Sequence, residues 1–168
     1  MIMSLELRRV KKTDLELLRD WRNLEEIRQF NTQYTLLNMR NQKNWFTDLQ
    51  KEKPDRHMFI INYKKNPIGI CGLIHHEKTN RTADVAIIIG DKKFRSRGFG
   101  TLALQKLIKF GFKKLKLHRI GAEVFEYNQE SERLFKKLDF KKEVILKQAL
   151  WRHSRWWNIH VFSLINDD

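Results

Sequence analysis

One segment constrains the fold more than any other, because an apolar strand, a basic glycine-containing loop and a long helix follow one another within residues 81–116. The run from Val85 to Ile89 is apolar at every position, which predicts a strand buried on both faces. Another apolar strand is predicted at 120–127. Two strands joined by a helix are most simply parallel neighbours with a right-handed crossover. Ligands of such units bind at the carboxyl ends of the strands, which here is the loop 91–100.

The loop and the helix of this segment are strongly basic. The chain of 168 residues has a net charge of +14, and residues 91–119 contain ten lysine and arginine residues against one acid, Asp91. Four helix lysines form a stripe about 80° wide: Lys106, Lys109, Lys113 and Lys116. A field of this sign attracts phosphorylated cofactors, nucleic acid and acidic proteins, and it disfavours polyamines as substrates.

The remaining pattern predicts one domain spanning residues 1–168. Further strands are expected at 5–10, 57–63 and 68–74, helices after a capping Thr13 and at 39–50 and 130–138, and a C-terminal hairpin at 144–151 and 156–165. The single cysteine, Cys71, excludes a disulfide framework and a multi-cysteine zinc site, and we expect no metal. Without a membrane-length apolar run or a signal-peptide core, we expect a cytoplasmic protein with no membrane partner.

The loop from Arg95 to Thr101 predicts an anion site. Gly98 and Gly100 let a ligand approach the backbone, and the N-terminus of the following helix presents unpaired N–H groups. The Walker sequence is absent. The two glycines and Ala103 match a dinucleotide fingerprint, but seven residues separate Gly98 from the preceding strand, and only 40 follow residue 128. An ordinary glycine turn that binds nothing is the third interpretation.

Taken together, these motifs resemble the GNAT superfamily of acyl-CoA N-acyltransferases. The family signature, a buried strand, a loop Q/R-x-x-G-x-G/A and a long helix, is matched by residues 83–116, and the family asparagine and short helix by Asn128 and residues 130–138. Asp139 departs from the glycine usual before Phe140. The hairpin and residues 20–23 look like the branch that acetylates ribosomal-protein N-termini and amino-sugar nucleotides. The resemblance implies a mixed α/β (α+β) fold with a mostly antiparallel sheet, one splayed parallel strand pair and helices on both faces.

The resemblance also implies where acetyl-CoA binds as the acetyl donor. The backbone of Ile87, Ile88 and Ile89 would pair with the pantetheine arm, and an N–H near Ile88 would stabilise the developing oxyanion. Amides of the loop would hold the pyrophosphate, with the family asparagine at the same site: Arg95, Ser96, Arg97, Gly98, Phe99, Gly100, Thr101 and Asn128.

Several residues are candidates for proton transfer. Phe135 stands where many members carry an acidic tyrosine, and it cannot donate a proton. In the ribosomal-protein branch an N-x-x-S pattern supplies a serine instead, and residues 128–131 match it, with Ser131 as the acid. The alternative is that Asn128 caps a helix and Ser131 only fills space. Tyr127 is a second candidate acid, and the candidate bases, which are also potential structural partners of cations, are Asp84 and Glu126.

The expected reaction is direct attack of a primary amine on acetyl-CoA in a ternary complex. An α-amine has a pKa near 8, against about 10.4 for lysine, so an acidic protein N-terminus or an amino-sugar nucleotide is the expected acceptor. Two other functions stay open: a nucleic-acid-binding module that uses the basic helix and the tryptophan-rich hairpin, and a dinucleotide-binding oxidoreductase. We expect no nucleic-acid partner, and a homodimer is kept as an alternative to a monomer.

Overall fold

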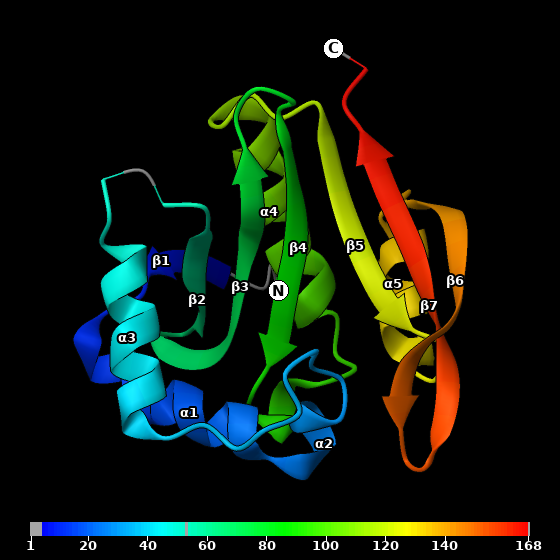
Figure 1. Cartoon of the computed structure of the whole chain (residues 1–168). Helices are drawn as coiled ribbons and strands as arrows, with labels where there is room; N and C mark the ends of the chain where they lie inside the picture. The colour runs from blue at the N-terminus through cyan, green and yellow to red at the C-terminus, as the bar shows by residue number, and fades with distance from the viewer. Residues whose placement is uncertain (1–4, 53, 168) are drawn as a thin grey trace.

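The computed structural model describes residues 5–52 and 54–167, which are built around one twisted seven-stranded sheet (Figure 1). The strands are β1 Leu5–Arg9, β2 His57–Tyr63, β3 Asn66–Glu77, β4 Thr82–Ile89, β5 Arg119–Phe125, β6 Lys141–Arg152 and β7 Arg155–Ile165. The helices are α1 Leu15–Asn23, α2 Glu25–Arg28, α3 Met39–Leu49, α4 Phe99–Lys113 and α5 Gln129–Lys137. In the described part of the chain, no helix is both long enough and apolar enough to cross a membrane.

The strand order is β1-β2-β3-β4-β5-β7-β6, and β4 and β5 are its parallel pair, whereas the other neighbours are antiparallel. Helix α4 makes the crossover between these two parallel strands, as the sequence predicts. The C-terminal hairpin of β6 and β7 turns at residues 153–154. The predicted fold class, a mixed and mostly antiparallel sheet with one splayed parallel pair, is confirmed.

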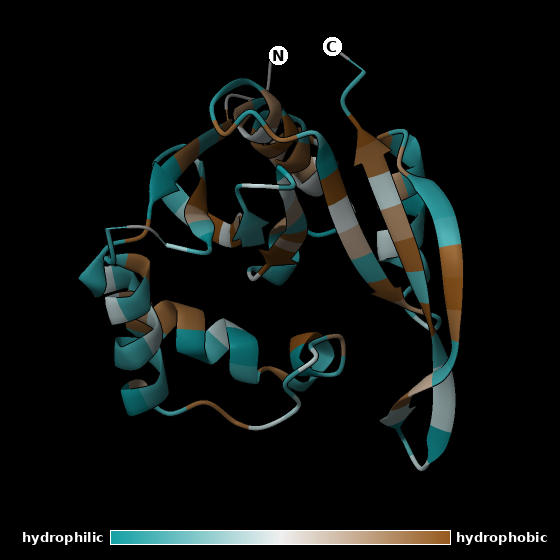
Figure 2. Cartoon of the chain, turned by 45° about the horizontal axis from the view of Figure 1, so that its top comes forward, coloured by the Kyte–Doolittle hydropathy of each residue, from teal (hydrophilic) through white to brown (hydrophobic). Residues whose placement is uncertain are grey.

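Two hydrophobic cores form, one on each face of the sheet. On one face, α4 buries Ala103, Leu104 and Leu107 completely, and its lysine stripe faces solvent. On the other face, α1 and α3 cover β2 and β3, with Leu18 and Trp21 packed near Ile60 and Ile70. Along β5, one hydrophilic band interrupts the hydrophobic residues (Figure 2). The predicted helices on both faces of the sheet are therefore present.

The start of α1 differs from the prediction. Thr13 lies in a 3₁₀ turn at Lys12–Asp14, and the helix begins at Leu15 after Asp14 rather than after a capping threonine. Asp14 accepts a hydrogen bond from the Lys11 N–H at 2.7 Å and is paired with both terminal nitrogens of Arg8 at 2.8 Å. The charge-assisted hydrogen bonds of Asp14 to Arg8 are stronger than those of a threonine hydroxyl, so Asp14 and not Thr13 precedes the helix.

Candidate active site

Strands β4 and β5 pair over only three residues and then diverge. The pairing joins Thr82–Asp84 to Arg119–Gly121; beyond it, β4 stays with β3 as far as Ile89, and β5 stays with β7 as far as Phe125 (Figure 1). Residues Val85–Ile89 are consequently only half-buried, so the prediction of complete burial on both faces is wrong. Val85, Ile87 and Ile89 pack against one core and Ile88 against the other, and each also remains partly exposed beside the divergence.

Hydrogen bonds at the two ends of β4 show toward which neighbouring strand its backbone N–H and C=O groups point. The Arg81 carbonyl accepts from the N–H groups of His118 and Arg119 on the β5 side, whereas the Gly90 N–H donates to Ile68 on the β3 side. Backbone groups alternate in direction along a strand, so odd-numbered residues point toward β5 and even-numbered ones toward β3. The N–H groups of residues 85, 87 and 89 therefore face the divergent edge.

The turn after β4 is held by Arg95. Its Nε donates to the Ile89 carbonyl and its Nη2 to the Gly90 carbonyl, both at 2.9 Å, and its Nη1 pairs with Glu26 of α2. The Ser96 hydroxyl donates to Glu130 of α5 at 2.5 Å. The side chains thus fix the turn from outside and leave its main chain accessible.

The backbone of this turn presents consecutive free amides. Ser96 has a φ of 53° and Gly98, which caps α4, a φ of 84° in the left-handed region. Within residues 5–52 and 54–167, no group of the chain accepts a hydrogen bond of normal geometry from the N–H groups of residues 96–101. Free amides at the positive end of a 15-residue helix form an anion site.

Gly100 has no structural reason to be glycine. A Cβ built on it would lie 3.5 Å from Leu134 Cδ2 and 3.9 Å from Ile87 Cδ1, which is ordinary contact. Its φ is not in the left-handed region, unlike that of Gly98. Glycine in a helix is less stable than alanine by roughly 0.5–1 kcal/mol. The absence of a side chain here leaves the main chain open to close approach by a ligand.

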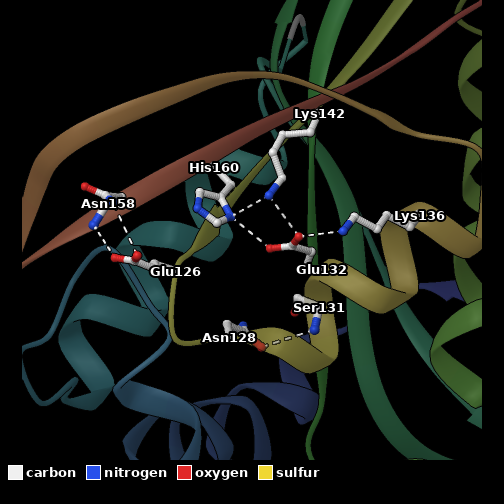
Figure 3. A network of polar contacts seen from close by, with 8 residues as sticks. All are labelled: Glu126, Asn128, Ser131, Glu132, Lys136, Lys142, Asn158 and His160. Atoms are coloured by element: carbon white, nitrogen blue, oxygen red, sulfur yellow. Dashed lines mark hydrogen bonds and ion pairs between the residues drawn. The ribbon is translucent and has the colours of Figure 1, made fainter.

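Asn128 caps α5, because its Oδ1 accepts a hydrogen bond from the Ser131 N–H at 3.2 Å (Figure 3). Ser131 is half-buried in the first turn of that helix, and Phe135 on the same helix is in the core. The Tyr127 hydroxyl donates to the Gln29 carbonyl at 2.5 Å, and its ring packs on Trp157 at 4.8 Å between centroids. Burial raises the pKa of Tyr127, and its hydroxyl proton is engaged in the bond to Gln29.

The two candidate bases both have partners. Asp84 lies at the closed end of the divergence, where its Oδ2 is 3.0 Å from Nδ1 of His75, and its other oxygen would be 2.4 Å from a Cβ on Gly121. Glu126 accepts from both the main-chain N–H and the side-chain amide of Asn158, at 3.0 and 3.2 Å (Figure 3). The structure brings Asn128 and Ser131 together and leaves Asp84 apart from them.

The sequence analysis missed an ionic network on α5. Glu132 is 2.7 Å from Lys136 Nζ, 2.9 Å from Lys142 Nζ and 2.8 Å from Nδ1 of His160 (Figure 3). These hydrogen bonds, that from Lys136 foremost, lower the pKa of Glu132 to about 2. The network fixes α5 against β6 and β7. Only the spacing of Glu132 and Lys136, four residues apart, gave any signal for it in the sequence.

Residues 24–38 bridge from α1 to the tip of the hairpin. The Arg152 guanidinium donates to the carbonyls of Asn31 and Thr32, and it lies 4.7 Å from the centre of the Tyr34 ring. The end of the bridge returns to α1, where Asn23 exchanges two hydrogen bonds of 2.8 Å with the backbone of Leu37. The bridge therefore borders the face of the sheet opposite α4, next to the open end of the divergence (Figure 1).

A family model for the acetyltransferase (GNAT) domain matches residues 4–141. The chain belongs to the GNAT family. Among relatives of this GNAT protein, the uncharacterized N-acetyltransferase p20 of Bacillus licheniformis is 30% identical over 165 residues, covering 96% of this chain and 92% of the relative. Spermidine N(1)-acetyltransferase of Vibrio cholerae is 21% identical over 156 residues, covering 93% and 90%.

The fold of this GNAT chain matches that of a solved relative. The crystal structure of the Vibrio cholerae spermidine N-acetyltransferase in complex with CoA and spermine has a TM-score of 0.90 at 20% identity, covering 96% of this chain and 95% of that one. This GNAT protein is an acetyl-CoA-dependent N-acetyltransferase, with acetyl-CoA as co-substrate. The nucleic-acid-binding and oxidoreductase alternatives are set aside. The resemblance to the ribosomal-protein and amino-sugar branch is not supported by these relatives.

Proposed function

We propose that residues 1–168 act as one catalytic domain that transfers the acetyl group directly to a primary amine in a ternary complex. In this proposal, acetyl-CoA lies between the divergent halves of β4 and β5, and its pyrophosphate binds the amides of residues 96–101. The Arg95 N–H, which the sequence placed in the same set, instead donates to the Lys92 carbonyl at 3.2 Å. The six consecutive free amides from Ser96 to Thr101 carry the proposal. The unexplained glycine at position 100 and the cations Lys92, Lys93 and Arg97 around the turn support it.

The backbone of β4 would then orient the pantetheine arm and the thioester. The N–H groups of Ile87 and Ile89 face the divergent edge, whereas the N–H of Ile88 points toward β3 and its side chain packs with the α1 core. We therefore assign the donor that stabilises the negative charge on the thioester oxygen to Ile87 or Ile89 instead of Ile88. Such a donor is worth about 2.7–4 kcal/mol in other enzymes.

The proton for the leaving thiolate would come from Ser131. No hydrogen bond to its hydroxyl is present in the portion of the chain that the structure covers, whereas the Tyr127 hydroxyl is committed to Gln29. Ser131 also follows Asn128 in the same turn, which fixes its helix and hence its direction. Tyr127 is the alternative acid, and it would first have to break its bond to the bridge.

A strong general base is not required when the pKa of the acceptor amine is near 8. An α-amine or a sugar amine is deprotonated in part near neutral pH, so water in the cleft suffices to accept the proton. Asp84 as the base stays a prediction. Its contact with His75 and its place at the closed end instead fit a structural partner.

The acceptor we propose carries negative charge, as an acidic protein N-terminus or an amino-sugar nucleotide does. A polyamine site needs carboxylates whose charge is not neutralised. Near the bridge and the hairpin, Glu25 pairs with Arg28, Glu26 with Arg95, and Glu132 with two lysines and His160. Glu126 differs, because it accepts hydrogen bonds from the neutral amides of Asn158 and keeps its charge. At long range, the net charge of +14 also repels a polyamine and attracts an anionic acceptor.

Spermidine is the second candidate acceptor, because relatives of similar length and fold bear the name spermidine acetyltransferase. The test is release of free thiol from saturating acetyl-CoA with spermidine, an acidic peptide and an amino-sugar nucleotide at equal concentrations. We expect the highest kcat/KM with one of the two anionic acceptors. A higher kcat/KM with spermidine would refute the proposed acceptor class and leave the acetyl-CoA site intact.

A further inference from the structure

The last turn of α1 contains one residue without a structural role. Asp20 pairs with Arg19, Trp21 covers Gly90 so closely that a Cβ there would be 2.0 Å from its ring, and Asn23 holds the bridge. Arg22 lies between them. In the described residues it makes neither an ion pair nor a hydrogen bond.

Arg22 nevertheless lies on the side of α1 that faces the sheet. At 100° per residue, it lies about 40° from the centre of the helix face that carries Leu15, Leu18 and Trp21, all of which are buried. The residue is half-buried, and burial lowers the pKa of its guanidinium. An arginine stays protonated in proteins. Among residues 5–52 and 54–167, this permanent positive charge is thus held partly out of water with no acid paired to it.

Neighbouring carboxylates cannot supply that compensation without breaking other pairs. Asp20 is held by Arg19, Glu25 by Arg28, and Glu26 by Arg95. Each acid of residues 20–26 thus has a different arginine, and Arg22 is the one left over. A partly desolvated charge without a partner is costly to a folded protein. Such a cost is expected where a ligand brings the partner.

The position of α1 indicates which ligand that is. Trp21 covers Gly90 at the carboxyl end of β4, and Ile88 of the same strand packs into the α1 core. Helix α4 and its free amides occupy the opposite face (Figure 1). With the donor phosphates at the N-terminus of α4, the α1 face is the side from which an amine reaches the thioester.

We propose that Arg22 binds a carboxylate or phosphate group of the acceptor and so selects anionic amines. This inference rests on the proposed function, and it assigns the recognition of the acceptor to one residue. The planar guanidinium can hold either anion through two parallel hydrogen bonds. Since the contact would orient the amine, its loss lowers kcat/KM for anionic acceptors and leaves the binding of acetyl-CoA unchanged.

The experiment compares Arg22→Gln, Arg22→Lys and Arg22→Met with the wild type and with Arg19→Gln. Arg19 is the matched control, one turn earlier on the same helix and already paired with Glu16 and Asp20. Thiol release is measured with saturating acetyl-CoA and two acceptor pairs. One pair is a peptide beginning Ser-Glu-Glu and its Ser-Gln-Gln counterpart; the other is an amino-sugar nucleotide and the free amino sugar. The pairs distinguish a carboxylate from a phosphate as the bound anion.

We expect Arg22→Gln to lower kcat/KM about 10- to 100-fold for the anionic member of one pair. The uncharged member should change less than about threefold, and the KM of acetyl-CoA should not change. Arg22→Lys should retain an intermediate preference, and Arg19→Gln the full one. A second readout needs no turnover: Arg22→Met should raise the melting temperature of the free enzyme, because it removes an unpaired charge.

Three results would overturn the inference. One is an equal loss on both members of each pair; another is a preference unchanged in Arg22→Gln; the third is a raised Kd for CoA, which would assign Arg22 to the donor. Failure of the proposed function looks different, because the wild type itself would then show no preference for an anionic acceptor.

Discussion

Replacing Gly100 by alanine tests the anion site, because it should make the free enzyme more stable and at the same time lower its affinity for CoA. The added methyl group fits the protein, since its nearest neighbours would be Leu134 and Ile87 at 3.5 and 3.9 Å. A glycine-to-alanine change at an unstrained helical position stabilises a protein by roughly 0.4–1 kcal/mol. For a chain of this length, that raises the melting temperature by about 1–4 °C.

The same methyl group would stand between the ligand and the amides of the turn. Losing one charge-assisted hydrogen bond costs about 1.5–3 kcal/mol, which raises the Kd of CoA by about 10- to 100-fold. At a CoA concentration of 100 times the wild-type Kd, the ligand stabilises the wild type by about 2.7 kcal/mol, and a tenfold weaker variant by only about 1.4 kcal/mol. Gly100→Ala should therefore melt higher alone and gain less from CoA.

Calorimetric titration with CoA and thermal melting with and without CoA make the two measurements. Gly98→Ala is the control for backbone strain: nothing lies within 4 Å of its added Cβ, but its φ of 84° makes alanine unfavourable by about 1–2 kcal/mol. It should melt lower alone. Wild-type CoA affinity in Gly100→Ala would show that the pyrophosphate does not approach this turn, and the argument for the site would be lost.

Four further predictions follow from the site. Ser131→Ala should lower kcat by about 10²-fold or more at an unchanged KM for acetyl-CoA, and an unchanged kcat would remove Ser131 from the mechanism. Tyr127→Phe should keep kcat within about threefold but melt about 2–4 °C lower, because it loses the bond to the bridge; a large loss of kcat would make Tyr127 the acid. Asp84→Asn should leave kcat nearly unchanged, since this carboxylate is paired with His75, and a 10²-fold loss would restore it as the base. Glu132 has a folded-state pKa lowered to about 2, so its stabilising contribution is present above about pH 4.5 and is lost as the pH falls toward 2. Acid titration of stability should accordingly show Glu132→Gln below the wild type at pH 7 and converging with it near pH 2; a constant difference would contradict the ionic network.

Local patterns predicted most of the elements and the place of the anion site. The helix expected at 98–116 is Phe99–Lys113, and the hairpin turns at the expected residues 153–154. These features depend on hydrophobic period, turn residues and charge within a few residues of one another. The turn with unbonded amides was predictable for the same reason, because a strand, two glycines and a helix N-terminus are contiguous in the chain, and its role as an anion site stays a prediction.

Features that depend on distant parts of the chain were not predictable. The half-exposure of Val85–Ile89 depends on where β5 leaves β4, which an apolar run does not encode. The contact of Tyr127 with Gln29 spans 98 residues and that of Glu132 with His160 spans 28, so no local motif signals either. Arg22 looked like part of a family motif, and only the pairing of its neighbours shows that no acid in the described part of the chain is paired with it.

In the proposed site, the turn at residues 96–101 would hold the donor chiefly through main-chain N–H groups, and an amide persists whatever side chain is attached to it. Point mutations seldom abolish such a site, except at glycines where bulk intrudes. Recognition of the amine, in contrast, would fall to side chains on α1, the bridge and the hairpin, each of which one codon change can replace. With these proposed roles, such a scaffold would keep one thioester donor over evolutionary time while exchanging acceptors, and redesign of its specificity would begin at Arg22, where we expect no change in coenzyme affinity.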